Sequence, residues 1–202
     1  IGVSIINLKG GKMMYVSKKN VLSFSGNKQI NETGLFLVVD GHIMQESNGT
    51  LIKVLKQGSV FHVDPVKEPF FQYFSRGKCF LLEIEDEKYL EEITEKNIHR
   101  LAGALERYRL PARQRVEALI YQIALDVGVE SEDEIYIPVS CNQSELARYS
   151  NVSREYFVKI KNDLLMENMI SIRRRNWVLL EKSNWAKRPN CIPLEETAEV
   201  EA

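Results

Sequence analysis

The sequence N-Q-S-E-L-A-R-Y-S-N-V-S-R-E-Y-F-V-K-I-K-N-D-L-L-M-E-N-M-I, from Asn142 to Ile170, predicts two helices joined by a tight turn. Asn142 can cap the first helix, and Glu145 three residues later completes the pattern of a capping box. Asn151 lies in the turn and is one of the few non-glycine residue types that tolerate a left-handed backbone. Ser153 then caps the second helix.

The second predicted helix has one apolar side and one polar side. Its apolar residues recur at spacings of three and four, which is the pattern of one buried helix face. They are Phe157, Ile160, Leu164 and Leu165. Polar residues near the helix start lie off this stripe, where a recognition helix meets the edges of DNA bases. The candidates for base contacts are Arg154, Glu155, Tyr156 and Lys159. The alternative is an ordinary helical hairpin that matches the pattern by chance.

The segment E-L-A-R-Y-S-N-V-S-R-E-Y-F-V-K-I, from Glu145 to Ile160, resembles the helix-turn-helix of the Crp/Fnr family of bacterial transcription regulators. Within it, S-R-E at Ser153 to Glu155 is similar to a common form of the family's recognition-helix signature. The resemblance implies a regulator that binds DNA as a homodimer. Its implied partners are double-stranded DNA with a palindromic operator, a second copy of the chain, RNA polymerase and an unidentified small-molecule effector.

The resemblance also implies roles for single residues. Arg154 is the candidate for a bidentate contact to guanine, and Glu155 is the candidate for accepting a hydrogen bond from cytosine N4. Tyr156 is expected to touch a thymine methyl group or a phosphate. Lys159 stands where many relatives carry arginine, and lysine cannot form the same planar fork. The best-known half-site of the family therefore need not be the site of this chain.

The composition is that of a globular protein without a membrane span. The 202 residues, 44% of them hydrophobic and 27% charged, suffice for one large domain or two small ones. No apolar run approaches the roughly 18 residues of a membrane helix, and the N-terminal segment lacks the features of a signal peptide. Because the first residue is Ile1 rather than Met, we expect the natural chain to begin upstream. Three scattered cysteines, Cys79, Cys141 and Cys191, argue against a disulfide framework and favour a reducing cytoplasm.

Charge is distributed unevenly along the chain. The formal net charge of the whole chain is −1. Residues Pro138 to Arg188, however, contain ten Lys and Arg against five Asp and Glu, a net charge of +5. The C-terminal tail is acidic instead. Such asymmetry is expected when one part of a protein must approach phosphates.

The sequence offers no recognisable metal, cofactor or catalytic site. His42, His62 and His99 have no local ligand spacing, and no carboxylate completes a triad with them. No Ser/His/Asp order, glycine-rich phosphate loop or pair of carboxylates stands out. We therefore expect a protein that is not an enzyme and carries no cofactor. The rival hypothesis is a barrel that senses or catalyses, with the helical half as a protein-interaction module.

The first part of the chain predicts a β domain. Short alternating or apolar runs, separated by turn residues, are typical of strands. The strand candidates are Met13–Val16, Val21–Phe24, Leu35–Val39, Ile43–Gln45, Leu51–Leu55, Val60–Val63, Phe70–Phe74 and Cys79–Ile84. Between them, the dipeptides Asp40-Gly41 and Asn48-Gly49 are strong hairpin signals. Regular short strands of this kind predict a sandwich or a barrel.

Two stretches of this β domain add to the family resemblance. L-F-L-V-V-D-G-H-I from Leu35 and L-K-Q-G-S-V-F from Leu55 are similar to parts of the cyclic-nucleotide-binding-type β-roll of Crp/Fnr proteins. The alternative is another jelly-roll or cupin-like barrel. The predicted fold class is α+β, with a jelly-roll-like β-roll, a long dimerisation helix and a C-terminal winged helix-turn-helix domain. The expected boundaries are residues 1–85 for the sensor, 86–110 for helix and hinge, 111–188 for the DNA-binding domain and 189–202 for a flexible acidic tail.

The stretch from Ser59 to Lys78 departs from the nucleotide-binding members of the family. Those members carry an acidic residue, an arginine and a small hydroxyl residue for the ribose and the cyclic phosphate. Here no Arg is followed by Ser or Thr, so we expect no binding of cAMP or cGMP in the usual way. The β-roll is then expected to sense another effector, respond to a partner, or be degenerate in a constitutive regulator. Its aromatic residues form either barrel core or an apolar effector pocket, with Phe61, Lys67, Phe71, Tyr73 and Arg76 as candidates.

A helix of roughly 25 residues is predicted from Glu85 to Arg109, where the hydrophobic period changes from two to about 3.6. It carries two apolar stripes, which suggests two partners: its own barrel and a second copy of itself. The first stripe is Ile98, Leu101, Leu105 and Tyr108, and the neighbouring stripe is Leu90, Ile93, Asn97 and Ala104. We expect these residues at a dimer interface. The alternative is a helix with one stripe, packed only on its own domain. Leu110-Pro111 ends the helix and is the expected hinge.

A second helix from Ala112 to Val127 and a short strand from Ile135 to Val139 lead into the helix-turn-helix. Two strand-like runs after the recognition helix predict a wing hairpin with Arg173 to Asn176 as its turn. Arginines at a hairpin tip favour phosphate contacts beside the groove, and a merely solvated turn is the alternative. The expected phosphate contacts are Asn142, Gln143, Ser153, Arg173, Arg174 and Arg175.

Overall fold

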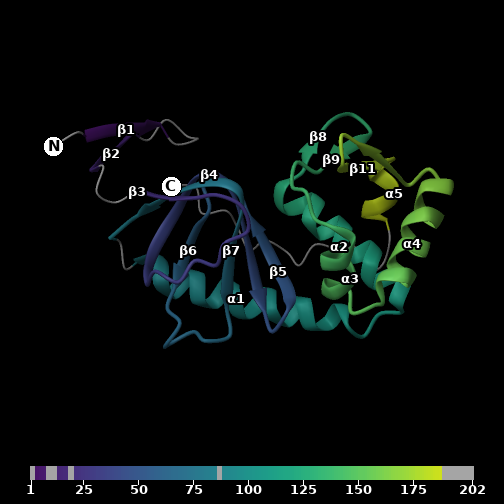
Figure 1. Ribbon diagram of the computed structural model, residues 1–202, viewed down its shortest axis with the longest axis horizontal. Coiled ribbons are helices and arrows are strands. Elements are labelled where there is room, and N and C mark those ends of the chain that lie inside the picture. Colours follow the sequence, from purple (N-terminus) through teal and green to yellow (C-terminus); the bar gives the residue numbers. More distant parts are fainter. Residues whose placement is uncertain (1–2, 8–12, 18–20, 86–87, 188–202) are drawn as a thin grey trace. The chain divides into compact units, whose positions relative to one another are not determined.

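The computed structural model describes residues 3–7, 13–17, 21–85 and 88–187 (Figure 1). The chain divides into two compact units, residues 1–98 and 99–202, with the boundary inside helix α1 (Lys88–Arg107). The acidic tail predicted for residues 189–202 lies outside the described residues.

The first unit is built on antiparallel strands. A separate hairpin pairs β1 (Val3–Asn7) with β2 (Met13–Ser17). The main sheet has the strand order β3-β7-β4-β5, and β6 pairs with β4. Its strands are β3 (Val21–Phe24), β4 (Gly34–Ser47), β5 (Thr50–Leu55), β6 (Val60–Val63) and β7 (Gln72–Glu83). β6 pairs with the first half of β4 and β5 with its second half, so β4 is the central strand of a roll that is not closed.

The prediction of a hairpin turn at Asp40-Gly41 was wrong. The two predicted strands on either side are one strand, β4, whose register against β7 shifts between Val38 and Asp40 and again between Asp40 and His42. Gly41 has a φ of 88°, and a Cβ there would lie 2.5 Å from the carbonyl oxygen of Lys78. The glycine is therefore needed for a bulge and a close approach of two strands, which use the same backbone freedom as a turn. The runs predicted at Phe70–Phe74 and Cys79–Ile84 likewise contribute to one strand, β7.

Aromatic and aliphatic side chains fill the inside of the roll. The ring of Phe61 lies 4.9 Å from that of Tyr73 and 5.7 Å from that of Phe36, measured between centroids. The surrounding core residues are Ile30, Val38, Ile43, Leu55, Val63, Cys79 and Leu81. Such aromatic pairs add to the stability that area burial supplies.

A polar contact ties the first half of α1 to the sheet. Gln45 of β4 donates Nε2–H to Oδ1 of Asn97 at 2.9 Å and to the hydroxyl of Tyr73 at 3.3 Å. Gln45 and Asn97 are both buried. Because buried amides are costly without partners, this contact fixes which side of α1 faces the sheet.

The second unit contains helices α2 to α5 and a small sheet. Helix α2 (Ala112–Val127) ends at Gly128, where a Cβ would lie 2.2 Å from the carbonyl oxygen of Ala124. The other elements are β8 (Val129–Glu130), β9 (Glu134–Tyr136), α3 (Gln143–Tyr149), α4 (Arg154–Met166), β10 (Ile170–Arg173), β11 (Asn176–Leu180) and α5 (Lys182–Ala186). The antiparallel sheet has the strand order β10-β11-β9-β8.

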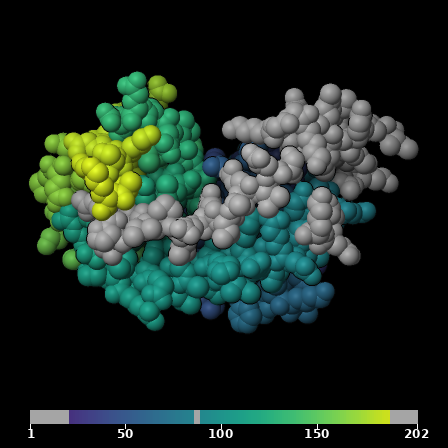
Figure 2. All heavy atoms as spheres, turned by 180° about the vertical axis from the view of Figure 1, so that it is seen from behind, coloured from purple at the N-terminus to yellow at the C-terminus, as the bar shows by residue number. Residues whose placement is uncertain are grey.

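Two tryptophans organise the core of the second unit. Trp177 of β11 meets Phe157 of α4 edge to face, with ring centroids 6.0 Å apart. Trp185 of α5 stacks on Tyr121 of α2 at 6.1 Å and donates Nε1–H to the carbonyl oxygen of Met169. In the space-filling view, α5 is part of the yellow surface that lies against the rest of the second unit (Figure 2). The sequence did not predict α5.

Candidate nucleic-acid interface

Local hydrogen bonds hold the helix-turn-helix as its sequence predicts. Asn142 Oδ1 accepts from the backbone N–H of Glu145 at 2.9 Å, and Glu145 Oε2 accepts from the N–H of Asn142 at 3.0 Å. This reciprocal capping box begins α3. Asn151 has a φ of 49°, in the left-handed region. Ser153 Oγ accepts from the N–H of Tyr156 at 3.1 Å and begins α4. These cap and turn predictions are confirmed.

Helix α4 buries one face and exposes the other. Phe157, Ile160 and Leu164 are buried, and Leu165 is half-buried. The predicted base-contacting residues Arg154, Glu155, Tyr156 and Lys159 are all exposed within the first two turns. All four side chains are therefore accessible to solvent around the first two turns of α4. A helix start presented in this way can enter the major groove of DNA.

The carboxylate of Glu155 is held in its charged form. The backbone N–H of Glu155 and the side chain of Ser153 lower the pKa of this carboxyl below its ordinary value. A negative charge is also favoured at the N-terminus of a helix, where unpaired N–H groups point outward. At neutral pH Glu155 is thus an acceptor only, as a contact to the amino group of cytosine requires.

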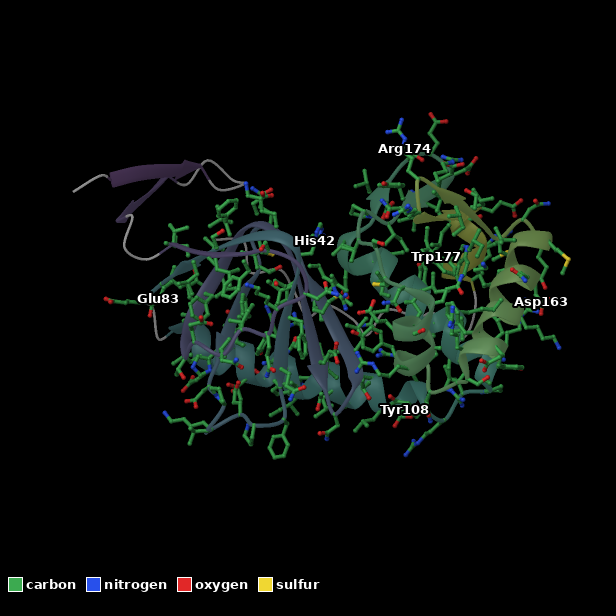
Figure 3. The ribbon with its side chains drawn as sticks, viewed as in Figure 1. His42, Glu83, Tyr108, Asp163, Arg174 and Trp177 are labelled. Carbon is green, nitrogen blue, oxygen red and sulfur yellow. The ribbon has the colours of Figure 1, made fainter. Side chains whose placement is uncertain are left out.

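The wing turn places two arginines at its tip. Arg174 and Arg175 have φ values of 51° and 72°, and Arg173 pairs with Asn176 across the hairpin. Two consecutive left-handed residues make the tight two-residue turn whose twist matches the flanking strands. Both side chains are exposed, and Arg174 extends away from the ribbon while Trp177 points inward (Figure 3).

Arg173 differs from the other two wing arginines because it has a partner in the same unit. Its Nη1 and Nη2 donate to the two carboxylate oxygens of Glu134 on β9, each at 2.7 Å. The bidentate pair ties the wing strand β10 to β9 across the sheet, and it lowers the pKa of Glu134. The remaining predicted phosphate contacts lie at helix starts. Asn142 and Ser153 are exposed, although each uses a side-chain oxygen as a cap, and Gln143 is half-buried.

The comparison with solved structures identifies the fold. The model matches a CRP-family transcriptional regulator from Thermus thermophilus with a TM-score of 0.61 and 16% identity over 84% of this chain and 96% of that chain. It matches FixK2 from Bradyrhizobium japonicum with a TM-score of 0.62 and 12% identity over 82% and 94% of the two chains. It also matches a CooA mutant from Carboxydothermus hydrogenoformans with a TM-score of 0.60 and 14% identity over 80% and 83%.

The chain has a Crp/Fnr-type fold. The fold class predicted from the sequence is therefore confirmed, with the difference that the sheet of the roll is open. No protein-family model matches the sequence, and no curated protein does. The structural comparison therefore establishes the fold, whereas the sequence identities to these structures are too low to transfer a function.

In this Crp/Fnr-type fold, the two predicted stripes of α1 have different surroundings. Ile93, Asn97 and Ala104 of one stripe are buried within the chain, whereas Leu90 is half-buried. Asn97 was predicted at a dimer interface, but its side chain faces β4. In the other stripe, Ile98 and Leu105 are 61% and 54% exposed, and Leu101 and Tyr108 are half-buried. This stripe of Ile98, Leu101, Leu105 and Tyr108 is the α1 seam.

The candidate effector residues differ in burial. Phe61 and Tyr73 are buried in the core of the roll, and Lys67 is exposed. Phe71 and Arg76 are half-buried at the surface. Phe61 and Tyr73 therefore match the core interpretation of the aromatic residues, because their rings pack on each other.

The loop that follows β6 uses its polar groups internally. Asp64 Oδ1 accepts from the N–H groups of Val66 and Lys67, and these hydrogen bonds lower the pKa of Asp64. Glu68 Oε1 accepts from the hydroxyl of Thr94 on α1, and its other oxygen lies 3.6 Å from Nδ1 of His62. An anionic carboxylate thus occupies this loop, which disfavours a second anion such as a phosphate.

Among residues 3–7, 13–17, 21–85 and 88–187, no group of three or more His, Cys, Asp or Glu could hold a metal ion. Within the same ranges, no helix is both long and apolar enough to cross a membrane.

Sequence reasoning missed two arginines behind the helix-turn-helix. Arg115 of α2 donates to backbone carbonyls of the turn between α3 and α4, and Arg113 donates to Glu167 at the end of α4. Both are half-buried. Their positions at the start of a helix carried no motif, and only the folded chain brings them to the recognition helix.

Proposed function

We propose that this protein is a sequence-specific DNA-binding transcriptional regulator that acts as a homodimer. The observation that carries the proposal is the exposed cluster of Arg154, Glu155, Tyr156 and Lys159 at the capped start of α4. A cation, an anion and an aromatic hydroxyl on one helix start match the donors and acceptors of base edges. Solved structures with the same fold are described as transcriptional regulators, which supports the proposal.

Base reading is assigned to α4 and phosphate binding to the surrounding residues. Arg154 is expected to donate to O6 and N7 of guanine, and Glu155 to accept from N4 of cytosine. Lys159 is one turn further along the exposed face and supplies a point charge rather than a fork. Arg174 and Arg175 at the wing tip are the main phosphate contacts. Arg173 is expected to hold the wing rather than to contact DNA, because Glu134 occupies its guanidinium.

Dimerisation is assigned to the α1 seam. Ile98 and Leu105 expose more than half of their surface, although both are large aliphatic residues. They lie seven residues apart, so a second copy of α1 can cover both in a coiled-coil contact. A two-fold dimer would present two recognition helices to two half-sites of a palindromic operator. Such a protein works where the DNA is, in the cytoplasm of a bacterial cell.

A ligand-independent regulator is the second candidate, and the loop after β6 favours it. Its Asp64 carboxylate accepts from backbone N–H groups and Glu68 accepts from Thr94, while Phe61 and Tyr73 fill the core. Carboxylates in this loop would repel a cyclic phosphate, because both carry negative charge. Calorimetry with cAMP and cGMP and thermal-shift screening of metabolites distinguish this candidate from a sensor. Tight binding of either nucleotide would contradict it.

Selection of bound DNA from a random pool tests the main proposal. We expect enrichment of a palindrome whose half-sites lie about one helical turn apart. Affinity for random DNA should fall steeply with salt, because Lys and Arg release counterions when they bind phosphates. A pool without enrichment and a flat salt dependence would contradict DNA binding and favour a protein-interaction module.

A further inference from the structure

One side chain joins the turn of the helix-turn-helix to the segment that follows α1. Arg115, in the first turn of α2, donates Nε–H to the carbonyl oxygen of Ser150 at 2.9 Å. Its Nη2 donates to the carbonyl oxygen of Asn151 at 3.0 Å, and its Nη1 donates to that of Leu110 at 2.9 Å. All three acceptors belong to the backbone. Arg115 therefore holds chain segments in place, whatever side chains those segments carry.

The charge of Arg115 has a physical reason at this position. The carbonyls of Ser150 and Asn151 come directly after α3, whereas that of Leu110 lies in the connection between α1 and α2. Carbonyls at the end of a helix lack partners within it and carry partial negative charge. A planar guanidinium with five N–H groups can satisfy several of them at once. One cation thus stabilises the end of α3 and the connection that precedes α2.

The far end of the recognition helix has a second anchor on the same helix. Arg113 Nη2 donates to Glu167 at 2.5 Å, and Glu167 is the residue that ends α4. Arg113 also donates Nε–H to Glu117 at 2.8 Å, and the side chain of Glu117 is almost fully buried. The two arginines at the start of α2 therefore contact the segments before and after α4.

We propose that Arg115 positions the recognition helix and couples it to the Leu110-Pro111 hinge, with Arg113 as the second anchor. The coupling follows from the shared guanidinium. If the carbonyl of Leu110 moves when the hinge bends, either its hydrogen bond to Arg115 breaks or the guanidinium follows and pulls on Ser150 and Asn151. The role in DNA reading rests on the proposed function, whereas the coupling of hinge and turn does not.

DNA binding by charge-matched variants tests the positioning role. Arg115→Gln and Arg115→Lys are compared with Arg109→Gln, a control in the same connection whose side chain pairs with Glu106 instead. We expect both Arg115 variants to weaken binding to the selected operator by about tenfold or more, since each loses charged hydrogen bonds. Affinity for random DNA should change only as much as in the control. Full operator affinity in Arg115→Lys would overturn the proposal, because charge alone would then suffice.

Amide hydrogen exchange tests the coupling without DNA. We expect faster exchange in the turn from Asn151 to Tyr156 in Arg115→Gln, with unchanged exchange in the sheet of the same unit. Pro111→Gly, which frees the hinge backbone, should speed exchange in the turn of the wild type but add nothing in Arg115→Gln. If Pro111→Gly raised the exchange rate of the turn equally in the wild type and in Arg115→Gln, the coupling would be refuted. A chain that binds no DNA would still give these exchange results, so this outcome is separate from failure of the proposed function.

Discussion

Single backbone positions set the geometry on which both units depend. Gly41 permits the bulge in β4, because its φ of 88° is strained for other residues and the space beside it is filled by Lys78 and Cys79. Asn151 plays the matching role in the helix-turn-helix, where φ is 49°. At these positions the allowed residue types follow from the backbone rather than from side-chain contacts.

Replacing Gly41 by Ala should destabilise the roll by about 2 kcal/mol or more. Left-handed backbone costs a Cβ-bearing residue about 1–2 kcal/mol, and the overlap with Lys78 and Cys79 adds to this loss. Gly77→Ala is the matched control, because Gly77 has a φ of 67° but open space around it. Urea unfolding followed by circular dichroism measures both variants. Equal destabilisation by the two would show that the close approach of β7 does not matter.

Replacing Arg154 by Ala should weaken binding to the selected operator by about 1–3 kcal/mol and relax the preference at one base position. The physical reason is the loss of a bidentate contact to one base. Binding to random DNA, measured at the same salt concentration, serves as the control. A loss of equal size on random DNA would assign Arg154 to phosphate binding instead.

At the scale of elements, the wing depends on one ion pair between two strands. Arg173 and Glu134 form two hydrogen bonds of 2.7 Å, and the pKa of Glu134 is lowered from its ordinary value of 4.5 because Arg173 donates to it. A group with a lowered folded-state pKa stabilises the fold above its unfolded-state pKa. That stabilisation is lost as the pH falls through the folded-state pKa.

Glu134→Gln should therefore lower the melting temperature at pH 7, and the difference from the wild type should vanish as the pH falls well below 4.5. Glu132→Gln, an exposed neighbour, is the control for the loss of one negative charge. Thermal unfolding across this pH range measures the effect. A difference that persists at the lowest pH would point to packing rather than to the ion pair.

At the scale of the whole molecule, the α1 seam is the surface on which the proposed dimer depends. Leu105→Lys, and independently Ile98→Lys, should shift the chain from dimer to monomer, because each puts a charge into an apolar contact. His99→Lys is the control on a neighbouring exposed position of α1. Analytical ultracentrifugation gives the oligomeric state. A seam variant that stays dimeric would place the interface elsewhere.

The parts of the fold that the sequence predicted are those governed by local contacts. The capping box of α3 and the cap of α4 join residues three apart. The left-handed backbone of Asn151 concerns a single residue. Contacts between distant residues escaped prediction. A glycine such as Gly41 is compatible with both a turn and a bulge. Only the pairing of β4 with β7 shows which of the two forms.

In the candidate site, too, residues that follow a local pattern were predicted and residues placed by long-range contacts were not. Arg154 and Lys159 could be found because they lie off a helical apolar stripe. Arg115 contacts residues 35 and 36 positions away, and Arg173 contacts one 39 positions away. No periodic pattern encodes such pairs. The effector residues are the extreme case, because burial of Phe61 and Tyr73 depends on how five strands come together.

The positions of the tryptophans give the second unit a spectroscopic signal of its own. The chain has two tryptophans, Trp177 and Trp185, and both lie in the core of the second unit. Tryptophan emission therefore reports the melting of the second unit alone, whereas the roll of the first unit melts without a tryptophan signal. Far-ultraviolet circular dichroism records both events. The offset between the two melting curves measures directly how far the stability of one unit depends on the other.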